Sequence, residues 1–193
     1  MYSIVFHLGK NHYFRIFIIW IMMIQGLSAQ QLGVKSNLLY DATSTFNLGL
    51  EIGLAPKWTL ELPVNYNPWD FPENRKLKHW AIQPEARYWF CEKFNGHFIG
   101  LHATVAGYNV GGLKIFGLDK HRYEGELYGG GFSYGYHWTL TDHWSIEATA
   151  GIGYLRLSHG KYPCEKCEDK LGDFSKNWFG PVKAGVSVIY IIK

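Results

Sequence analysis

The chain has 193 residues, with 19 Lys and Arg against 16 Asp and Glu, which gives a formal net charge of +3. This near balance, without a basic patch, does not favour nucleic acid as a partner. Aromatic residues make up 17% of the chain and glycine occurs 22 times, yet the sequence after residue 29 has no long apolar segment. Because a transmembrane helix needs about 20 apolar residues, a helical membrane protein is excluded.

Residues 1–29 are typical of a cleaved export signal. Basic residues up to Arg15 precede an apolar run from Ile16 to Ile24, and Leu27-Ser28-Ala29 is a small-residue cleavage site. The apolar run is too short to span a bilayer as a helix, although an uncleaved anchor remains the alternative. We therefore expect an exported mature chain, residues 30–193, that forms one domain.

From Gln31 onward, apolar or aromatic residues alternate with polar, charged or glycine residues in successive stretches, most clearly from Trp144 to Tyr154. Alternate side chains lie on opposite faces of a strand, so the pattern predicts an apolar outside and a polar inside. The predicted fold is all-β, an eight-stranded antiparallel up-and-down transmembrane β-barrel. The expected strands are Leu32–Asp41, Thr45–Leu54, Lys57–Tyr66, His79–Phe90, His97–Val110, Arg122–Trp138, His143–Leu157 and Trp178–Ile192.

Short and long connections alternate along the chain, which indicates the orientation of the barrel. Ala42–Ser44 is a short first outer loop, and the other outer loops are longer: Asn67–Lys78, Gly111–His121 and Ser158–Asn177. In bacterial outer-membrane barrels, the short turns face the periplasm and the longer loops face the outside. The predicted location is the outer membrane, with extracellular loops and both termini in the periplasm.

The predicted outward faces place aromatic residues toward both ends of the strands, as in Trp58 and Tyr66 or Tyr128 and Trp138. Amphipathic rings prefer the level of the lipid headgroups, so these residues are expected to form interfacial girdles. A soluble β-sandwich or a lipocalin-like barrel, which also alternates, is the competing interpretation.

The predicted inward faces contain acidic and basic residues from different strands. An eight-stranded barrel is just wide enough for side chains to fill it, and buried charges persist when they are paired. We therefore predict a structural cluster of ion pairs that closes the lumen, with a catalytic carboxylate pair or a proton path as the alternative. Its members are Lys35, Glu51, Glu61, Glu85, Arg87, Glu147 and Lys183.

The last outer loop contains Cys164 and Cys167, while Cys91 lies on a predicted periplasmic turn. The pair is expected to form a loop disulfide or to remain as two free thiols. A metal site completed by His79, His121 and His159 is the alternative, because zinc needs more ligands than the pair supplies. We expect no metal and no cofactor.

Long runs of the chain resemble a known family. They are GVKSNLLYDATSTFNLGLEIGLAPKWTLELPVNYNPW from Gly33, LKHWAIQPEARYWFCEKFNGHFIGLHA from Leu77, HRYEGELYGGGFSYGYHW from His121, and KYPCEKC followed by NWFGPVKAGVSVIYIIK. These are similar to a family of small outer-membrane barrels common in Bacteroides-type bacteria, domain of unknown function 3575. The resemblance implies an outer-membrane protein of a Gram-negative cell and a link to surface fimbriae, and it supplies no catalytic residues. The ending Tyr190-Ile191-Ile192-Lys193 departs from the terminal aromatic residue of most such barrels.

Two classes of function are compatible with these features. The first is a monomeric, non-enzymatic barrel whose outer loops bind a surface or fimbrial protein or a ligand. The second is a lipid-modifying enzyme at the outer rim, for which Ser158 and His159 with Asp173 or Asp119 are the candidates, and a narrow pore is a third. The expected contact anchors, which can equally be girdle residues, are Trp69, Phe71, Trp178 and Phe179.

Overall fold

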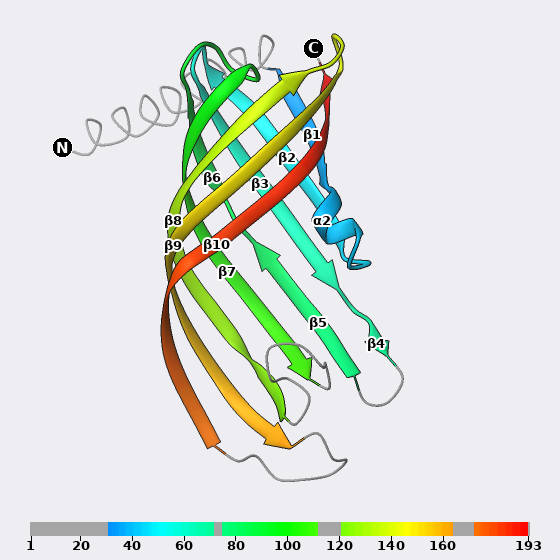
Figure 1. The fold of residues 1–193 in the computed structure, drawn as a ribbon, viewed down its shortest axis with the longest axis vertical. Coiled ribbons are helices and arrows are strands. Elements are labelled where there is room, and N and C mark those ends of the chain that lie inside the picture. The colour runs from blue at the N-terminus through cyan, green and yellow to red at the C-terminus, as the bar shows by residue number, and fades with distance from the viewer. Residues whose placement is uncertain (1–30, 72–74, 112–120, 164–171, 193) are drawn as a thin grey trace, which may run out of the picture. The chain divides into compact units, whose positions relative to one another are not determined.

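The computed structural model describes residues 31–71, 75–111, 121–163 and 172–192 (Figure 1). Leu32–Ile192 forms one compact unit. The predicted signal peptide lies outside the described residues, as do Cys164, Cys167 and most of the predicted loop Gly111–His121.

The described residues form an antiparallel sheet with one short helix. The elements are β1 (Leu32–Asn37), α2 (Leu38–Asp41), β2 (Phe46–Ala55), β3 (Trp58–Asn67), β4 (Asp70–Phe71), β5 (Arg75–Ile82), β6 (Glu85–Trp89), β7 (Gly96–Gly111), β8 (His121–Thr139), β9 (Trp144–Pro163) and β10 (Gly172–Ile192). This confirms the all-β, antiparallel expectation. Among the described residues, no helix has the length and apolar character needed to cross a membrane.

The strands close into a ring of eight positions, because the strand pairings return to their start (Figure 1). Each of the eight positions pairs with the next along the chain, and β10 pairs with β1 from Ile192↔Leu32 to Ser187↔Asn37. One position is shared by β5 and β6, which both pair with β3 and with β7, while β4 pairs with β5.

Pro84 explains why the predicted strand His79–Phe90 is divided into β5 and β6. Proline has no backbone N–H, so it cannot donate to the ladder. The register with β3 is the same on both sides of the break, from Val64↔Ile82 to Glu61↔Glu85. The carbonyl of Pro84 still accepts a hydrogen bond from Ala103 N at 3.0 Å. The two segments therefore act as one strand with a local interruption.

The predicted first strand is too long, because β1 ends at Asn37 and the chain then turns into α2. The side chain of Asn37 accepts a hydrogen bond from Leu39 N at 3.1 Å, which satisfies a free N–H at the start of the helix. Ser44, with φ of 55°, then reverses the chain into β2.

The predicted long outer loops are also wrong in extent, because paired strand continues into two of them. Tyr162 pairs with Arg122 in the β8–β9 ladder, and Gly172 pairs with Lys161 in the β9–β10 ladder. In the predicted loop Asn67–Lys78, strand β5 already begins at Arg75. These strand ends carry fewer apolar residues on their outward face, so the sequence pattern that marks the membrane-facing part of a strand does not extend to them.

The predicted alternation of faces is confirmed along the closed part of the ring. In β3, Leu60, Leu62 and Val64 are exposed on the outside, while Glu61 and Asn65 are buried inside. Apolar packing inside the ring is concentrated at the end where β1 begins and β10 ends. There, Phe94, Ile189 and Ile191 are buried together. Polar and charged side chains fill the middle of the interior.

Candidate functional site

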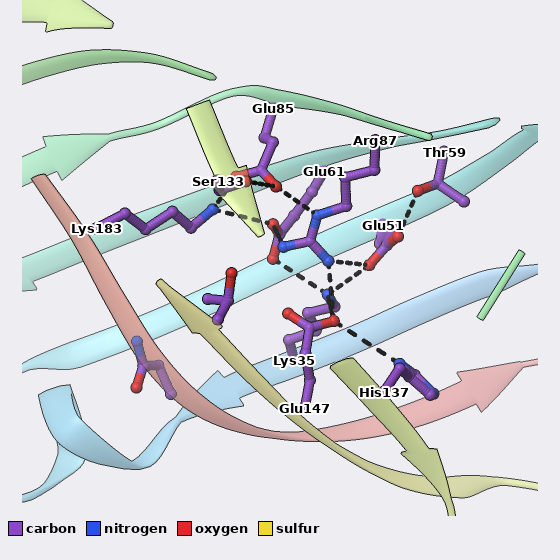
Figure 2. A network of polar contacts seen from close by, with 12 residues as sticks. Lys35, Glu51, Thr59, Glu61, Glu85, Arg87, Ser133, His137, Glu147 and Lys183 are labelled. Atoms are coloured by element: carbon purple, nitrogen blue, oxygen red, sulfur yellow. Dashed lines mark hydrogen bonds and ion pairs between the residues drawn. The ribbon is translucent and has the colours of Figure 1, made fainter. Parts of the chain in front are cut away.

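Arg87 is the centre of a buried ion-pair network inside the ring (Figure 2). It lies on β6 and points inward, and its side chain is completely buried. Its Nε donates to Glu85 Oε1 at 2.8 Å, and its Nη1 contacts Glu51 Oε2 and Glu147 Oε2, both at 3.0 Å. Its Nη2 forms an ion pair with Glu61. A guanidinium presents a planar fork of donors, so one side chain can pair with carboxylates from several strands.

Two lysines complete the network from β1 and β10. Lys35 Nζ lies 2.5 Å from Glu51 Oε2 and 2.9 Å from Glu147 Oε2. Lys183 forms an ion pair with Glu85, and its Nζ lies 3.5 Å from Glu61 Oε2. The structure thus brings together all seven residues of the predicted cluster: Lys35, Glu51, Glu61, Glu85, Arg87, Glu147 and Lys183.

The network contains four carboxylates and three cations, which would leave one negative charge if all were ionised. His137 lies close to one of these carboxylates, with Nδ1 3.7 Å from Glu147 Oε2. Each carboxylate lies within ion-pair distance of more than one cation. A buried charge is costly to desolvate unless it is paired, so each member depends on several others.

Neutral side chains also donate hydrogen bonds to the carboxylates of the network. Thr59 Oγ1 donates to Glu51 Oε1 at 2.5 Å and accepts from Trp89 Nε1 at 2.9 Å. Ser133 Oγ donates to Glu85 Oε1 at 2.9 Å. Sequence reasoning missed Thr59, Trp89 and Ser133, although each lies on the predicted inward face of its strand. The alternation of faces places all three inside the ring, but it does not show that they bond to the carboxylates.

An aromatic layer lies beside the network, toward the end of the ring where β1 begins and β10 ends. Phe98 packs against Trp89 with ring centroids 4.8 Å apart, and Arg87 Cζ lies 4.4 Å from the centre of the Phe98 ring. Trp89 also contacts His137 and Phe94, at 5.6 and 6.0 Å between centroids. This layer supports the guanidinium on one side and closes that end of the interior to water.

Glycines on the inward face make room for the network. A Cβ on Gly100 would collide with Glu85 Oε1 and Ser133 Oγ, which already bond to each other. A Cβ on Gly135 would collide with the Phe98 ring. These positions explain why glycine recurs on the polar faces of the strands.

The space left next to the network is small. A cavity of about 40 Å³ is bordered by Lys35, Asn65, Gln83, Glu147 and Lys183, among others. A water molecule needs roughly 10–15 Å³ of such space, so the cavity has room for a few waters and not for a substrate. Its carboxylates are held in ion pairs, and this arrangement suits a structural role better than acid–base catalysis.

The candidate catalytic residues do not converge. Ser158 and His159 are consecutive in β9, so their side chains lie on opposite faces of the sheet. Asp173 pairs in register with Gly160 and shares the outward face with Ser158. Asp119 lies outside the described residues. His159 therefore lacks the geometry to activate Ser158 as a nucleophile.

The predicted contact aromatics are placed in three different environments. Trp69 Nε1 donates to the Ser44 carbonyl at 2.8 Å, which ties the segment after β3 to the turn after α2. Trp178 pairs with Leu155 on the inward face of β10, whereas Phe179 is 77% exposed on the outward face. Phe71 belongs to β4, and its side chain is outside the described part of the structure.

The predicted loop cysteines and metal ligands lie partly outside the described residues. Cys164 and Cys167 lie outside the described residues, and Cys91 is exposed with a free thiol. His79 Nδ1 lies 3.1 Å from the Leu77 carbonyl, and the side chain of His121 is not described. Within the described ranges, no group of three or more His, Cys, Asp or Glu residues is arranged to hold a metal ion.

Comparison with known proteins identifies a family for the chain. No curated protein matches it, and no solved structure matches it. The family described as "protein of unknown function (DUF3575)" matches residues 15–192. Because this match spans nearly the whole chain, the protein belongs to the DUF3575 family.

Proposed function

We propose that the protein is an outer-membrane β-barrel with a closed lumen, and that it acts by binding another surface component at its outer end. The observation that carries this proposal is the opposite polarity of the two faces of the ring. Exposed apolar side chains cover the outside, and a buried network of seven charged residues fills the inside. A soluble barrel or sandwich would be expected to bury its apolar face.

The outer surface supports a position within a bilayer. Phe132, Ile152 and Leu101 are 69%, 59% and 58% exposed in the middle of their strands. Aromatic residues flank this apolar band at both ends, as in the pairs Trp144↔Tyr190 and Tyr154↔Phe179. Such girdles are typical of barrels in the outer membrane. The termini and short turns would then face the periplasm, and the extended strands of β7–β10 would face the outside.

The interior argues against a pore. Arg87, Glu51 and Glu147 are completely or almost completely buried, and the aromatic layer of Trp89 and Phe98 closes one end. Moving a solute through the ring would require the ion pairs to separate without water to replace them, which is costly for buried charges.

A lipid-modifying enzyme at the outer rim is the second candidate, and the geometry supports it less well. Its nucleophile and base would be Ser158 and His159, which face opposite sides of β9. A binding role needs no such convergence. The family resemblance implies surface or fimbrial proteins as the class of partner. A monomeric barrel would contact such a partner through its outer strand ends.

The test is to shorten the β9–β10 hairpin beyond Ser158 and Asn177 while the closed ring remains intact. Folding of the variant is checked by heat-dependent mobility in gels, and cells are assayed for capture of surface proteins, fimbrial display and lipid A composition. We expect altered partner capture with unchanged lipid A. Altered lipid A with unchanged partner capture would contradict the proposal and favour the enzyme.

A further inference from the structure

Several strands continue beyond the closed part of the ring and form an outer sheet (Figure 1). We define the outer sheet as residues 77–81 of β5, 106–110 of β7, 123–127 of β8, 155–159 of β9 and 174–180 of β10. On the other side of the ring, β1 ends at Asn37 and is followed by α2. The outer sheet is therefore open on the side where β1 would have continued.

The inner face of the outer sheet can be identified from the strand register. Asn65 is buried inside the ring, and partners across a ladder share a face. From Asn65, the pairs run through Ala81, Ala106, Leu127 and Leu157 to Lys176. A second row runs from buried Asn67 through His79, Tyr108, Gly125 and His159 to Phe174.

Polarity reverses where the outer sheet begins. Inside the ring the inner face is polar, but in the outer sheet it carries Leu127, Leu155, Leu157, Phe174 and Trp178. The outward face changes in the opposite sense, from apolar residues to Glu124, Glu126, Arg156, Ser158 and Asn177. An apolar inner face of this kind lies beyond the membrane-facing band, and Trp178 and Phe174 on it are 42% and 50% exposed.

The apolar face ends at β10, which has an unpaired backbone edge there. Among the described residues, Phe174–Gly180 pairs with β9 on one side and with no strand on the other, because β1 reaches β10 only from Ser187 onward. Every second residue of such an edge directs its N–H and C=O away from the sheet, ready to pair with another chain. Lipid or detergent cannot satisfy these donors and acceptors, whereas an extended peptide can.

The unpaired edge of β10 ends at Gly180, on the side toward the closed ring. A register shift lies between Pro181 and Lys183, and Asn37 Nδ2 lies 3.5 Å from the Ala184 carbonyl. The bulge and the proline interrupt pairing at this point, so the available edge ends at Gly180. It has the length of a short strand and opens toward the outer end.

The charges on the inner face specify the partner further. In the outer sheet, the described inner rows carry Lys176, His79 and His159 but no acidic residue. Lys176 is exposed and has no ion-pair partner among the described residues. An added strand would place one side chain opposite Lys176 and apolar side chains opposite Phe174 and Trp178, and opposite charges across a ladder are favourable.

We propose that the edge Phe174–Gly180 receives an extended segment of a partner protein by strand addition, with apolar side chains facing Phe174 and Trp178 and an acidic side chain facing Lys176. This proposal rests on the proposed function, since it requires the outer sheet to face the cell exterior, and it specifies the partner as a peptide strand. The backbone of β10 supplies affinity, and the alternating inner row supplies specificity.

The test uses the full mature protein folded in detergent micelles and a synthetic seven-residue peptide. The peptide carries valine at the positions facing Phe174 and Trp178, glutamate facing Lys176, and threonine elsewhere. We expect saturable binding, with slower amide hydrogen exchange in β10 from Phe174 to Gly180. The K176E variant should bind this peptide about fivefold more weakly and should bind a peptide with lysine in place of glutamate correspondingly better.

The matched control is N177E, which changes the neighbouring outward-facing residue and should leave binding unchanged. A second control is the same peptide with methylated backbone nitrogens on one edge and then on the other. Methylation of the pairing edge should weaken binding by at least about tenfold. The heat-dependent gel mobility of each variant shows whether the barrel is folded, independently of peptide binding.

Three outcomes would overturn the proposal. The first is absence of binding by the folded protein at millimolar peptide, and the second is equal binding of all methylated peptides. The third is a dimer in which this edge is already occupied by a second copy, detected by an intermolecular disulfide in an N177C variant whose native Cys91, Cys164 and Cys167 are changed to serine. Each of these can occur with a normal outer-membrane barrel, so failure of this inference is distinguishable from failure of the proposed function.

Discussion

At the residue scale, the interior depends on Arg87 more than on any other side chain of the network. It contacts Glu51, Glu61, Glu85 and Glu147, which come from four different strands. Removing it leaves carboxylates that remain buried with too few cations. The cost of such a change comes mainly from the uncompensated charges and less from the lost contacts.

We expect R87A to reduce the free energy of unfolding by about 3–5 kcal/mol, because it leaves buried carboxylates unpaired. The measurement is urea unfolding in lipid vesicles, followed by gel mobility or tryptophan fluorescence. R156A is the control, since Arg156 is an exposed residue on the outward face of β9, and its effect should stay within about 0.5 kcal/mol. Equal effects of the two variants would show that the Arg87 network is not buried as described.

Gly100 gives a second prediction at this scale. In G100A, the added methyl group would displace Glu85 and Ser133, which are held by Arg87 and by each other. We expect a loss of about 1–3 kcal/mol, typical of overpacking in a filled interior. G49A is the comparison, because its Cβ would lie 3.2 Å from Lys35 Cβ, a milder contact than those at Gly100, and its loss of stability should be smaller. A stable G100A variant would indicate that the network is loosely packed.

At the element scale, the strands could be predicted wherever one face is apolar and the other polar. The period of two gave the eight ring positions and the inward residues of β3, including Glu61. It could not give the end of β1, because Leu38 and Tyr40 continue the outward-facing apolar positions while Asn37 starts a helical turn. It also missed the outer parts of β9 and β10, where the two faces exchange polarity and the pattern no longer resembles a membrane strand.

The candidate site was predictable in part for the same reason. Charged residues on inward faces of a narrow ring must meet, so the seven members of the network followed from alternation alone. Which carboxylate contacts which cation depends on the register between strands, and the sequence does not fix this register. The aromatic layer of Trp89 and Phe98 required the same knowledge, because it joins β6 to the paired strand β7.

The connections provide a test of orientation. Cys91 lies on the short turn between β6 and β7 and is exposed, while Ser158 lies on the outward face of β9 at the other end. With Cys164 and Cys167 changed to serine, we expect a membrane-impermeant maleimide to label the S158C variant on intact cells and to leave Cys91 unlabelled until the outer membrane is permeabilised. Labelling of Cys91 alone on intact cells would reverse the orientation.

At the scale of the whole molecule, the polarity of both faces reverses once along the strands. In the closed part of the ring, apolar residues are outside and charges are inside. In the outer sheet, apolar residues line the inner face and charges lie outside. The first arrangement suits a bilayer, and the second suits an aqueous surface with a protected binding face. A single pair of strands, β9 and β10, contains both arrangements, so the change of environment can be located along them.

Spin labels along β9 in lipid vesicles test the central claim most directly, namely a membrane-facing outside around a closed interior. With Cys91, Cys164 and Cys167 changed to serine, labels are attached to cysteines introduced at Ala148, Ala150 and Ile152 on the outward face and at Thr149, which borders the small cavity. The account predicts that the outward labels are accessible to oxygen dissolved in lipid and protected from a water-soluble nickel complex. The Thr149 label should be protected from both reagents. Access of the nickel complex to the outward labels would contradict the membrane position, and its access to the Thr149 label would contradict the closed interior.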